Sequence, residues 1–298
     1  MKKIYLMLAA FTAVAALNAQ TFTNSNNLLD DDYNSGGCLG VSDMDNDGFD
    51  DIILLDNSTD LKIIYQTVDG MSEVSYGTVS GANQWGMAVG DVDNDGHSDV
   101  FSGGNFDGTH LVKIANVGVS EQQELNNGQL FMQGCNLADI DNDGMLDAFG
   151  CHDVGLSKIW MNNGTTLVYD GEVIDLESYD FSFYPDTDHS GNYGSTWTDF
   201  DDDGDIDLFI AKCRQGVGDA TDPRRINQLW VNDGNNNYTE QAVERGLVPY
   251  EQSWTSDFAD IDNDGDFDCL LTNHSNTMLI LENNAGYFTD ITEGSGLA

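Results

Sequence analysis

Short apolar runs separated by polar turns follow one another along the chain from about residue 37 onward. The run at 51–55 reads Asp-Ile-Ile-Leu-Leu, and the run at 207–210 reads Asp-Leu-Phe-Ile. Short runs of apolar and β-branched residues that are bounded by turn residues are typical of strands. Because no helical periodicity of any length follows the first 19 residues, the pattern predicts an all-β protein.

A polar phrase of nine residues interrupts these runs five times, with Asp at positions 1, 3, 5 and 9 and Gly at position 6. Alternate side chains on a tightly curled loop can all point inward, and the glycine allows the sharp turn. Four carboxylates this close repel one another unless a cation lies between them. Merely solvated acidic turns would not explain the constant glycine. The spacing therefore predicts calcium-binding loops, and up to five Ca²⁺ ions, because calcium prefers six to eight oxygen ligands.

The predicted metal ligands are the four aspartates of each copy: Asp43, Asp45, Asp47, Asp51, Asp91, Asp93, Asp95, Asp99, Asp139, Asp141, Asp143, Asp147, Asp199, Asp201, Asp203, Asp207, Asp260, Asp262, Asp264 and Asp268. An EF-hand loop shares positions 1, 3, 5 and 6, but it requires a Glu at position 12 and a helix on each side. Position 12 of the five copies holds Leu54, Ser102, Gly150, Ile210 and Leu271. The flanks are β-like, so each loop is predicted to join two antiparallel strands.

The loops begin 48, 48, 60 and 61 residues apart, a period that is typical of propellers and repeat arrays. Each repeat has room for four strands, which is the content of one propeller blade. In the fourth repeat the predicted strands are 193–198, 206–212, 227–232 and 238–243. In the fifth repeat they are 253–259, 267–272, 277–282 and 287–291. The core of such a fold lies between successive blades, where Trp85, Trp197, Trp230 and Trp254 are expected to be packing residues.

These loops in their β context resemble the FG-GAP/VCBS repeat family, the units of integrin α-like calcium-binding β-propellers. The phrases at 227–232 and 238–247 resemble the variant found in cartilage acidic protein-like secreted proteins. The resemblance covers about residues 37–298 and implies a propeller of four-stranded blades with calcium at the hairpin loops. Five repeats fit either a closed five-bladed ring or part of a seven-bladed one, the usual number in integrin-like members.

The first 19 residues read as a secretory signal peptide, with Lys2 and Lys3 before an apolar core from Ile4 to Leu17 and a small residue, Ala19, for cleavage. The alternative is a buried N-terminal helix. The apolar core is too short for a comfortable membrane span. The sequence therefore predicts a signal peptide at 1–19, a propeller domain at 20–298, no membrane span, and a secreted or cell-surface location.

The charge balance is strongly acidic, with 52 Asp and Glu against 10 Lys and Arg, a net charge of −42. Removal of Lys2 and Lys3 with the signal peptide leaves a net charge of −44. This balance argues against nucleic acid and anionic lipid as partners.

Five cysteines, an odd number, leave at least one without an intramolecular partner. Cys135 and Cys151 flank the third loop symmetrically, and they form either a disulfide or two buried core thiols.

No nucleophile motif, zinc-protease motif or phosphate loop is present. The sequence therefore predicts that the chain is not an enzyme. It predicts a binding or adhesion module for a glycan or protein ligand, which acts as a monomer or as part of a larger surface assembly. Two alternatives are a calcium-dependent carbohydrate-active enzyme of polysaccharide-lyase type and a purely structural calcium-rigidified spacer. Elaborated loops on one face would favour the binding module over the spacer.

The fourth repeat carries extra residues near 186–193 and 213–226, on either side of its predicted hairpin. The loop closes one end of that hairpin, so both insertions should converge at the other end. In integrin-like propellers that face carries the ligand loops, and the resemblance implies the same here. The candidate ligand-binding residues are His189, Lys212, Arg214, Arg224 and Arg225. Such a basic cluster is either an anion clamp for a ligand or a structural partner for Asp186, Asp188 and Asp222.

Overall fold

The structure is a computed structural model that describes residues 26–29, 31–176 and 189–296. The chain divides into one unit at Met1–Asp32 and a second at Tyr33–Ala298, and each is described by itself. The described part of the first unit contains a short 3₁₀ helix, η1 (Asn26–Leu28). The predicted signal peptide at 1–19 lies outside the described residues.

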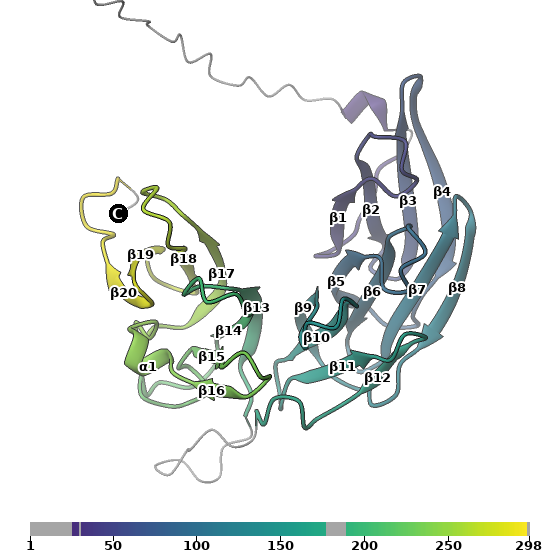
Figure 1. Cartoon of the computed structure of the whole chain (residues 1–298). Coiled ribbons are helices and arrows are strands. Elements are labelled where there is room, and N and C mark those ends of the chain that lie inside the picture. The colour runs from purple at the N-terminus through teal and green to yellow at the C-terminus, as the bar shows by residue number, and fades with distance from the viewer. Residues whose placement is uncertain (1–25, 30, 177–188, 297–298) are drawn as a thin grey trace, which may run out of the picture. The chain divides into compact units, whose positions relative to one another are not determined.

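The described residues of the second unit form five antiparallel sheets of four consecutive strands each (Figure 1). Blade 1 consists of β1 (Leu39–Ser42), β2 (Asp51–Asp56), β3 (Asp60–Thr67) and β4 (Gly70–Thr78). Blade 2 consists of β5 (Gln84–Gly90), β6 (Asp99–Gly104), β7 (Thr109–Asn116) and β8 (Val119–Glu124). Blade 3 consists of β9 (Met132–Ala138), β10 (Asp147–His152), β11 (Lys158–Asn162) and β12 (Leu167–Tyr169). Blade 4 consists of β13 (Asn192–Thr198), β14 (Asp207–Lys212), β15 (Gln228–Asn232) and β16 (Tyr238–Glu240). Blade 5 consists of β17 (Ser253–Ala259), β18 (Asp268–Asn273), β19 (Leu279–Asn284) and β20 (Tyr287–Asp290).

The prediction of an all-β propeller with four-stranded blades is confirmed, while the closure of the array, and its possible place in a seven-bladed ring, stay predictions. Strand bounds in blades 4 and 5 agree with the predicted ones to within about two residues, with one exception. The predicted strand at 238–243 ends at Glu240, and a helix, α1 (Ala242–Arg245), follows it. Gly246 ends this helix in the left-handed conformation, with φ of 86°, a conformation that glycine adopts without steric cost.

The hydrophobic core is distributed between successive blades, as predicted. One cluster of buried side chains joins blades 1 and 2, and others join blades 2 and 3, blades 3 and 4, and blades 4 and 5. Phe149 of blade 3, for example, shares its cluster with Leu208 and Trp230 of blade 4. Apolar side chains from two sheets thus leave water together, which is the main favourable term in folding.

The first strands of consecutive blades approach each other very closely at two glycines. A Cβ atom on Gly134 of β9 would lie 2.8 Å from the carbonyl oxygen of Tyr193 in β13. A Cβ atom on Gly194 of β13 would lie 2.7 Å from the carbonyl oxygen of Trp254 in β17. Because real Cβ atoms do not come within 3.0 Å of a backbone oxygen, the spacing of these blades requires the absence of a side chain at both positions.

In each of blades 2 to 5, the first strand has one residue more than the second strand over the segment in which the two are paired. The pairing of β5 with β6 skips Trp85, and the pairings of β13 and β17 with their partners skip Tyr193 and Trp254. In β9 the extra residue lies at 133–134. A β-bulge of this kind bends the strand and re-aims a side chain, so these blades share a local distortion at the end remote from their acidic loops.

Two of the four tryptophans that were expected to be packing residues are not buried. Trp230 is buried and Trp197 packs against the same cluster, but Trp85 and Trp254 are 47% and 49% exposed. The prediction was wrong for these two because each is the bulged residue of its strand, which turns the indole out of the core.

All five cysteines are free thiols, and four of them are buried. Cys135 and Cys151 therefore correspond to the second predicted alternative, core thiols without a disulfide. Burial raises the pKa of the Cys151 thiol to about 12, which keeps it protonated and unreactive near neutral pH.

Among the described residues, no helix has the length and apolar character that a membrane span requires.

Candidate metal centres

Three carboxylates converge in each of the five loops, here numbered loop 1 to loop 5 from the one that begins at Asp43. In every group one carboxylate oxygen from each residue lies within 4.8 Å of the others. The groups contain positions 1, 3 and 9 in loops 1, 2, 3 and 5, and positions 1, 3 and 5 in loop 4. The structure thus brings together three of the four aspartates that the sequence predicts for each site.

The carboxylate at position 1 organises the loop backbone. In loop 1, Asp43 Oδ1 accepts the N–H of Asp47 at 3.2 Å, and Asp43 Oδ2 accepts the N–H of Gly48 at 2.9 Å. The same two hydrogen bonds recur in the other four loops at 2.9–3.2 Å. Charge-assisted hydrogen bonds of this kind fix the chain around the carboxylate before any ion is considered.

Positions 4 and 6 supply the backbone conformations that the curled loop needs. Position 4 is left-handed in every copy, with φ between 56° and 64°, at Asn46, Asn94, Asn142, Asp202 and Asn263. Asn and Asp tolerate this region better than other residues with a side chain. At position 6, Gly144 has φ of 88° and no atom within 4 Å of where its Cβ would be. The glycine is therefore required by its backbone angle and not by lack of space.

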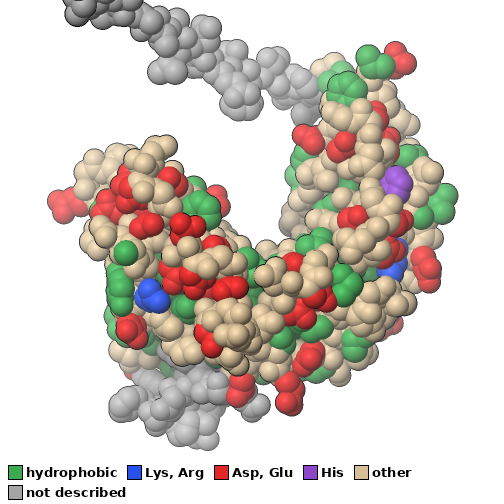
Figure 2. Space-filling view, in the orientation of Figure 1, with side chains coloured by type: hydrophobic (Ala, Val, Ile, Leu, Met, Phe, Trp, Pro, Cys, Tyr) green, Lys and Arg blue, Asp and Glu red, His purple; other side chains and the backbone are tan. Residues whose placement is uncertain are grey.

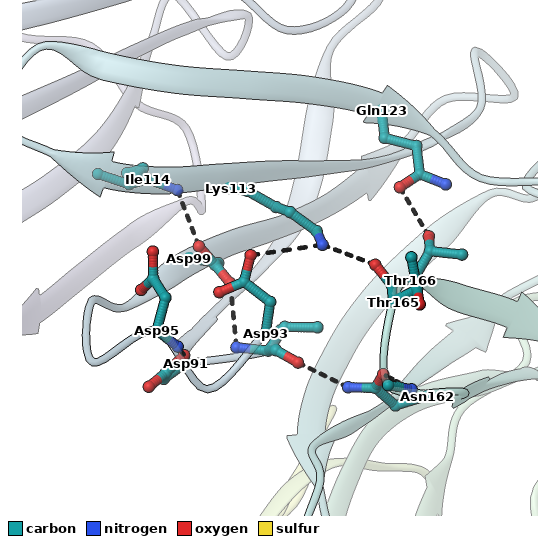
Figure 3. Close-up of polar contacts among 12 residues, drawn as sticks. Asp91, Asp93, Asp95, Asp99, Lys113, Ile114, Gln123, Asn162, Thr165 and Thr166 are labelled. Carbon is teal, nitrogen blue, oxygen red and sulfur yellow. Dashed lines mark hydrogen bonds and ion pairs between the residues drawn. The ribbon is translucent and has the colours of Figure 1, made fainter.

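The carboxylate at position 9 is buried and joins the loop to two strands. Asp99 is 0% exposed, and it accepts the N–H of Val92 at 3.0 Å and the N–H of Ile114 at 2.8 Å (Figure 3). Burial raises the pKa of Asp99 and of Asp147 to about 6, because a charged carboxylate loses hydration there. A buried anion with like charges beside it is stabilised by a cation at the same place.

The donor set of the loops fits a hard divalent cation. All the converging atoms are carboxylate oxygens, which suit Ca²⁺ and Mg²⁺ rather than zinc or copper. Asp141 Oδ1 in loop 3 and Asp201 Oδ1 in loop 4 are buried and have no hydrogen-bond partner among the described residues. A buried oxygen without a partner costs about 1–3 kcal/mol, and a bound cation would satisfy it.

Two loops have a basic side chain beside position 3. Lys113 of β7 places its Nζ 3.4 Å from Asp93 Oδ2 in loop 2 and 2.8 Å from the Thr165 carbonyl oxygen in blade 3 (Figure 3). In loop 4, Arg245 of α1 lies 3.5 Å from Asp201 Oδ2 and also donates to the Gly286 carbonyl in blade 5 at 3.1 Å. Each of these two basic side chains therefore links a loop to the following blade.

The next blade also holds the carbonyl at position 2 of three loops. Asn162 Nδ2 of blade 3 donates to the Val92 carbonyl of loop 2 at 2.7 Å (Figure 3). Asn283 Nδ2 of blade 5 donates to the Phe200 carbonyl of loop 4 at 2.8 Å. Tyr238 Oη donates to the Ile140 carbonyl of loop 3 at 3.0 Å. Loop geometry and blade packing are thus coupled at these three junctions.

The basic residues predicted in blade 4 lie at the end of the β13–β14 hairpin that is remote from loop 4. As predicted, residues near 192 and 212 lie side by side there, since Asn192 pairs with Lys212. Lys212 is 1% exposed, and its Nζ donates to Asn192 Oδ1 at 2.6 Å and to the His189 carbonyl at 3.4 Å. The structure therefore brings Lys212 and His189 together, in a buried rather than an open position.

The arginines of this cluster have structural partners. Arg224 forms a two-point contact with the buried Asp222, at 2.9 Å from Nε to Oδ1 and 2.7 Å from Nη2 to Oδ2. Arg214 lies 3.5 Å from Asp153, and Arg225 donates to the Val217 carbonyl at 3.3 Å. Asp186 and Asp188, the other predicted partners, lie outside the described residues. These contacts favour the structural alternative, and a ligand-binding role for the cluster stays a prediction.

The bulged residues were not among the functional candidates that the sequence predicted. A signal was present, since Trp85, Gln133, Tyr193 and Trp254 each stand six residues before position 1 of the following loop. The constant offset places them at the same point of every first strand, yet aromatic residues in strands are ordinarily read as core.

Comparison with known proteins identifies the repeats. The model of the FG-GAP-like repeat matches residues 43–102, which contain loops 1 and 2, and residues 199–271, which contain loops 4 and 5. No curated protein matches the chain. A solved structure described as "YCF48 bound to D1 peptide" has a TM-score of 0.46 and 6% identity, over 86% of this chain and 67% of that one. The chain therefore contains FG-GAP-like repeats in these two regions, as its sequence predicts.

Proposed function

We propose that the chain is an exported binding module whose five hairpin loops bind Ca²⁺ and whose opposite face binds a glycan or protein ligand, without catalysing a reaction. The observation that carries the proposal is the same convergence of three carboxylates in five separate loops. Five copies of one costly arrangement of like charges are difficult to explain without a cation that offsets the repulsion.

Several features support calcium as that cation and an extracellular location. The loops supply oxygen ligands from a flexible turn, as calcium accepts and as Mg²⁺ with its stricter geometry does not. Extracellular modules bind calcium with Kd values of roughly 10⁻⁴–10⁻³ M, which suits exposed loops of this kind. The charged and apolar segment at 1–19 supports export through a signal peptide.

The charge of the surface bears on the partner. Figure 2 shows acidic side chains spread over the face in view, with few Lys or Arg among them, and the whole chain has a net charge of −42. Such a surface repels nucleic acid and anionic lipid. A protein or glycan remains the fitting partner class, bound by the chain as a monomer or within a larger surface assembly.

The proposal is tested in two steps on the purified mature chain. Calorimetric titration with Ca²⁺ after chelator treatment should give up to five equivalents, and an Asp139→Asn variant should lose one of them. The calcium-loaded chain is then screened against glycan and protein arrays, with EGTA as the matched condition. Absence of any Ca²⁺ binding contradicts the metal assignment. A glycan that is cleaved, rather than bound, contradicts the binding role.

A further inference from the structure

We infer that the cavity between the first strands of blades 2 to 5 binds a neutral saccharide, an assignment that rests on the proposed function because it names the ligand class and the place of binding. The cavity has a volume of about 660 Å³, within the range of roughly 300–1,000 Å³ that small-molecule sites occupy. It lies at the end of the first strands that is remote from the acidic loops.

The bulged residues of four blades line this cavity together. Trp85, Tyr193 and Trp254 come from β5, β13 and β17, and Gln133 comes from β9. The same distortion has thus turned the equivalent residue of each first strand toward one space. Bulges that re-aim side chains are over-represented beside functional sites, and here four of them converge.

The two exposed indoles are held in place by neighbouring rings. Trp85 is 47% exposed and packs with its ring centroid 5.8 Å from that of Phe131, which in turn stacks on Phe106 at 5.7 Å. Trp254 is 49% exposed and meets the His274 ring edge-on at 5.1 Å. A braced aromatic side chain offers contact area at little cost in conformational entropy.

The chemistry of the lining selects a neutral polar ligand. The other side chains that line the cavity include Asn136, Ser195 and Thr255, and none of the described lining residues is Asp, Glu, Lys, Arg or His. In a chain with 52 acidic residues, an uncharged site is a marked local exception. An anionic ligand would find no cation there and would meet the repulsion of the whole surface.

A saccharide has the two kinds of surface that this site complements. The C–H face of a sugar ring is apolar and flat and packs on an indole, while its hydroxyl groups pair with amide and hydroxyl side chains. A purely apolar ligand would instead remove water from the polar groups of Gln133 and Asn136 that their contacts with Asp153 and Ser195 leave unsatisfied. Indoles separated by neutral hydrogen-bonding groups fit an oligosaccharide, in which ring faces and hydroxyls alternate along the chain.

The test uses the calcium-loaded mature chain and neutral hexasaccharides of glucose, mannose and galactose, with an oligogalacturonate as the anionic counterpart. Binding is followed by calorimetry and by tryptophan fluorescence. We expect at least one neutral probe to bind and the anionic one not to. Trp85→Ala and Trp254→Ala should each weaken binding by about tenfold or more, and Trp254→Phe should retain part of it.

Tyr287→Ala is the matched control, because Tyr287 is a 51% exposed aromatic residue of β20 in blade 5 that lies outside the acidic loops and does not line the cavity. It should bind like the unaltered chain, and unchanged melting of all variants in calcium shows that they fold. Failure of every neutral probe, or full affinity in both tryptophan variants, overturns the inference. If a protein or anionic ligand binds and both tryptophan variants retain it, only this inference fails. A chain that binds calcium but no glycan or protein at all contradicts the proposed binding function as well.

Discussion

Asn162 Nδ2 lies 2.7 Å from the carbonyl oxygen of Val92 and 3.1 Å from that of Leu146, so one side chain of blade 3 holds loop 2 and loop 3 together. The same residue gives its backbone N–H to Asp147 at 2.6 Å. A change in the conformation of loop 2 should therefore alter loop 3, and binding of an ion in one of these loops should order the other.

Replacement of Asn162 by Ala should lower the free energy of unfolding by about 1–3 kcal/mol, because two buried carbonyl groups lose their donor. Urea denaturation in calcium measures the loss. Asn235→Ala is the matched control, since Asn235 is exposed and bonds only within its own turn; it should change stability by less than about 0.5 kcal/mol. Equal losses in the two variants would show that the junction carries no special weight.

Removal of calcium should destabilise the whole array. Ligands that bind only the folded state stabilise it by mass action, by about 1.4 kcal/mol per site at a tenfold excess over Kd. For a domain of this size, several such sites correspond to a fall in melting temperature of roughly 10 °C or more in EGTA, which excess Ca²⁺ should reverse. A melting curve that is the same in EGTA and in calcium would refute the metal assignment.

Gly144→Ala should cost about 1–2 kcal/mol of stability, because alanine is strained at a φ of 88°. Gly218→Ala separates this strain from crowding: neither glycine has an atom within 4 Å of its would-be Cβ, and Gly218 does not have a left-handed φ. Chemical denaturation of the two variants in calcium makes the comparison. A neutral Gly144→Ala would mean that the loop relaxes to another conformation.

Acidification should destabilise the calcium-loaded chain in part through His152. Burial lowers the pKa of this imidazole, whose Nδ1 accepts the Phe131 N–H at 3.0 Å. The unfolded chain therefore binds more protons than the folded one below the unfolded pKa of about 6.5, so this contribution is lost as the pH falls through that value. His152→Gln should flatten the pH dependence of stability between about pH 7 and 5.

Arg224→Ala should lower the free energy of unfolding by about 1–3 kcal/mol, because Asp222 is only 4% exposed and would keep a buried charge without its two-point partner. Arg224→Lys should recover only part of the loss, since an ammonium group cannot make both contacts at once. Arg225→Ala, which removes a single contact to a carbonyl, should cost less. If Arg224→Ala instead abolished ligand binding with unchanged stability, the anion-clamp alternative would be restored.

The acidic loops could be predicted because everything that shapes them is local. Asp43 bonds to the backbone four and five residues ahead, and the left-handed Asn46 and the glycine at Gly48 lie between the ligands. A pattern of nine residues therefore predicts both the set of metal ligands and the backbone angles of the loop. The strands followed from the same kind of short-range signal, the apolar runs between turns.

Features that depend on strand pairing, on packing against another blade or on side-chain geometry could not be predicted from local patterns. Trp85 and Trp254 have the composition of core residues, and only the pairing of the first strand with the second shows that each is skipped and turned outward. The helix α1 replaced the end of a predicted strand, and Ala242 within it is fully buried in the cluster shared with blade 5. The basic cluster was located by its insertions, whereas the pairing of Arg224 depends on side-chain geometry.

The shared cores have a consequence for how such a chain can be altered by duplication or truncation. Each cluster takes side chains from one repeat and from the next, so cutting the chain at the boundaries of a repeat separates side chains that pack together. The segment that would be copied as a unit and the group of side chains that packs as a unit therefore do not coincide. A new repeat could be accommodated only where both of its faces match the neighbours it is given.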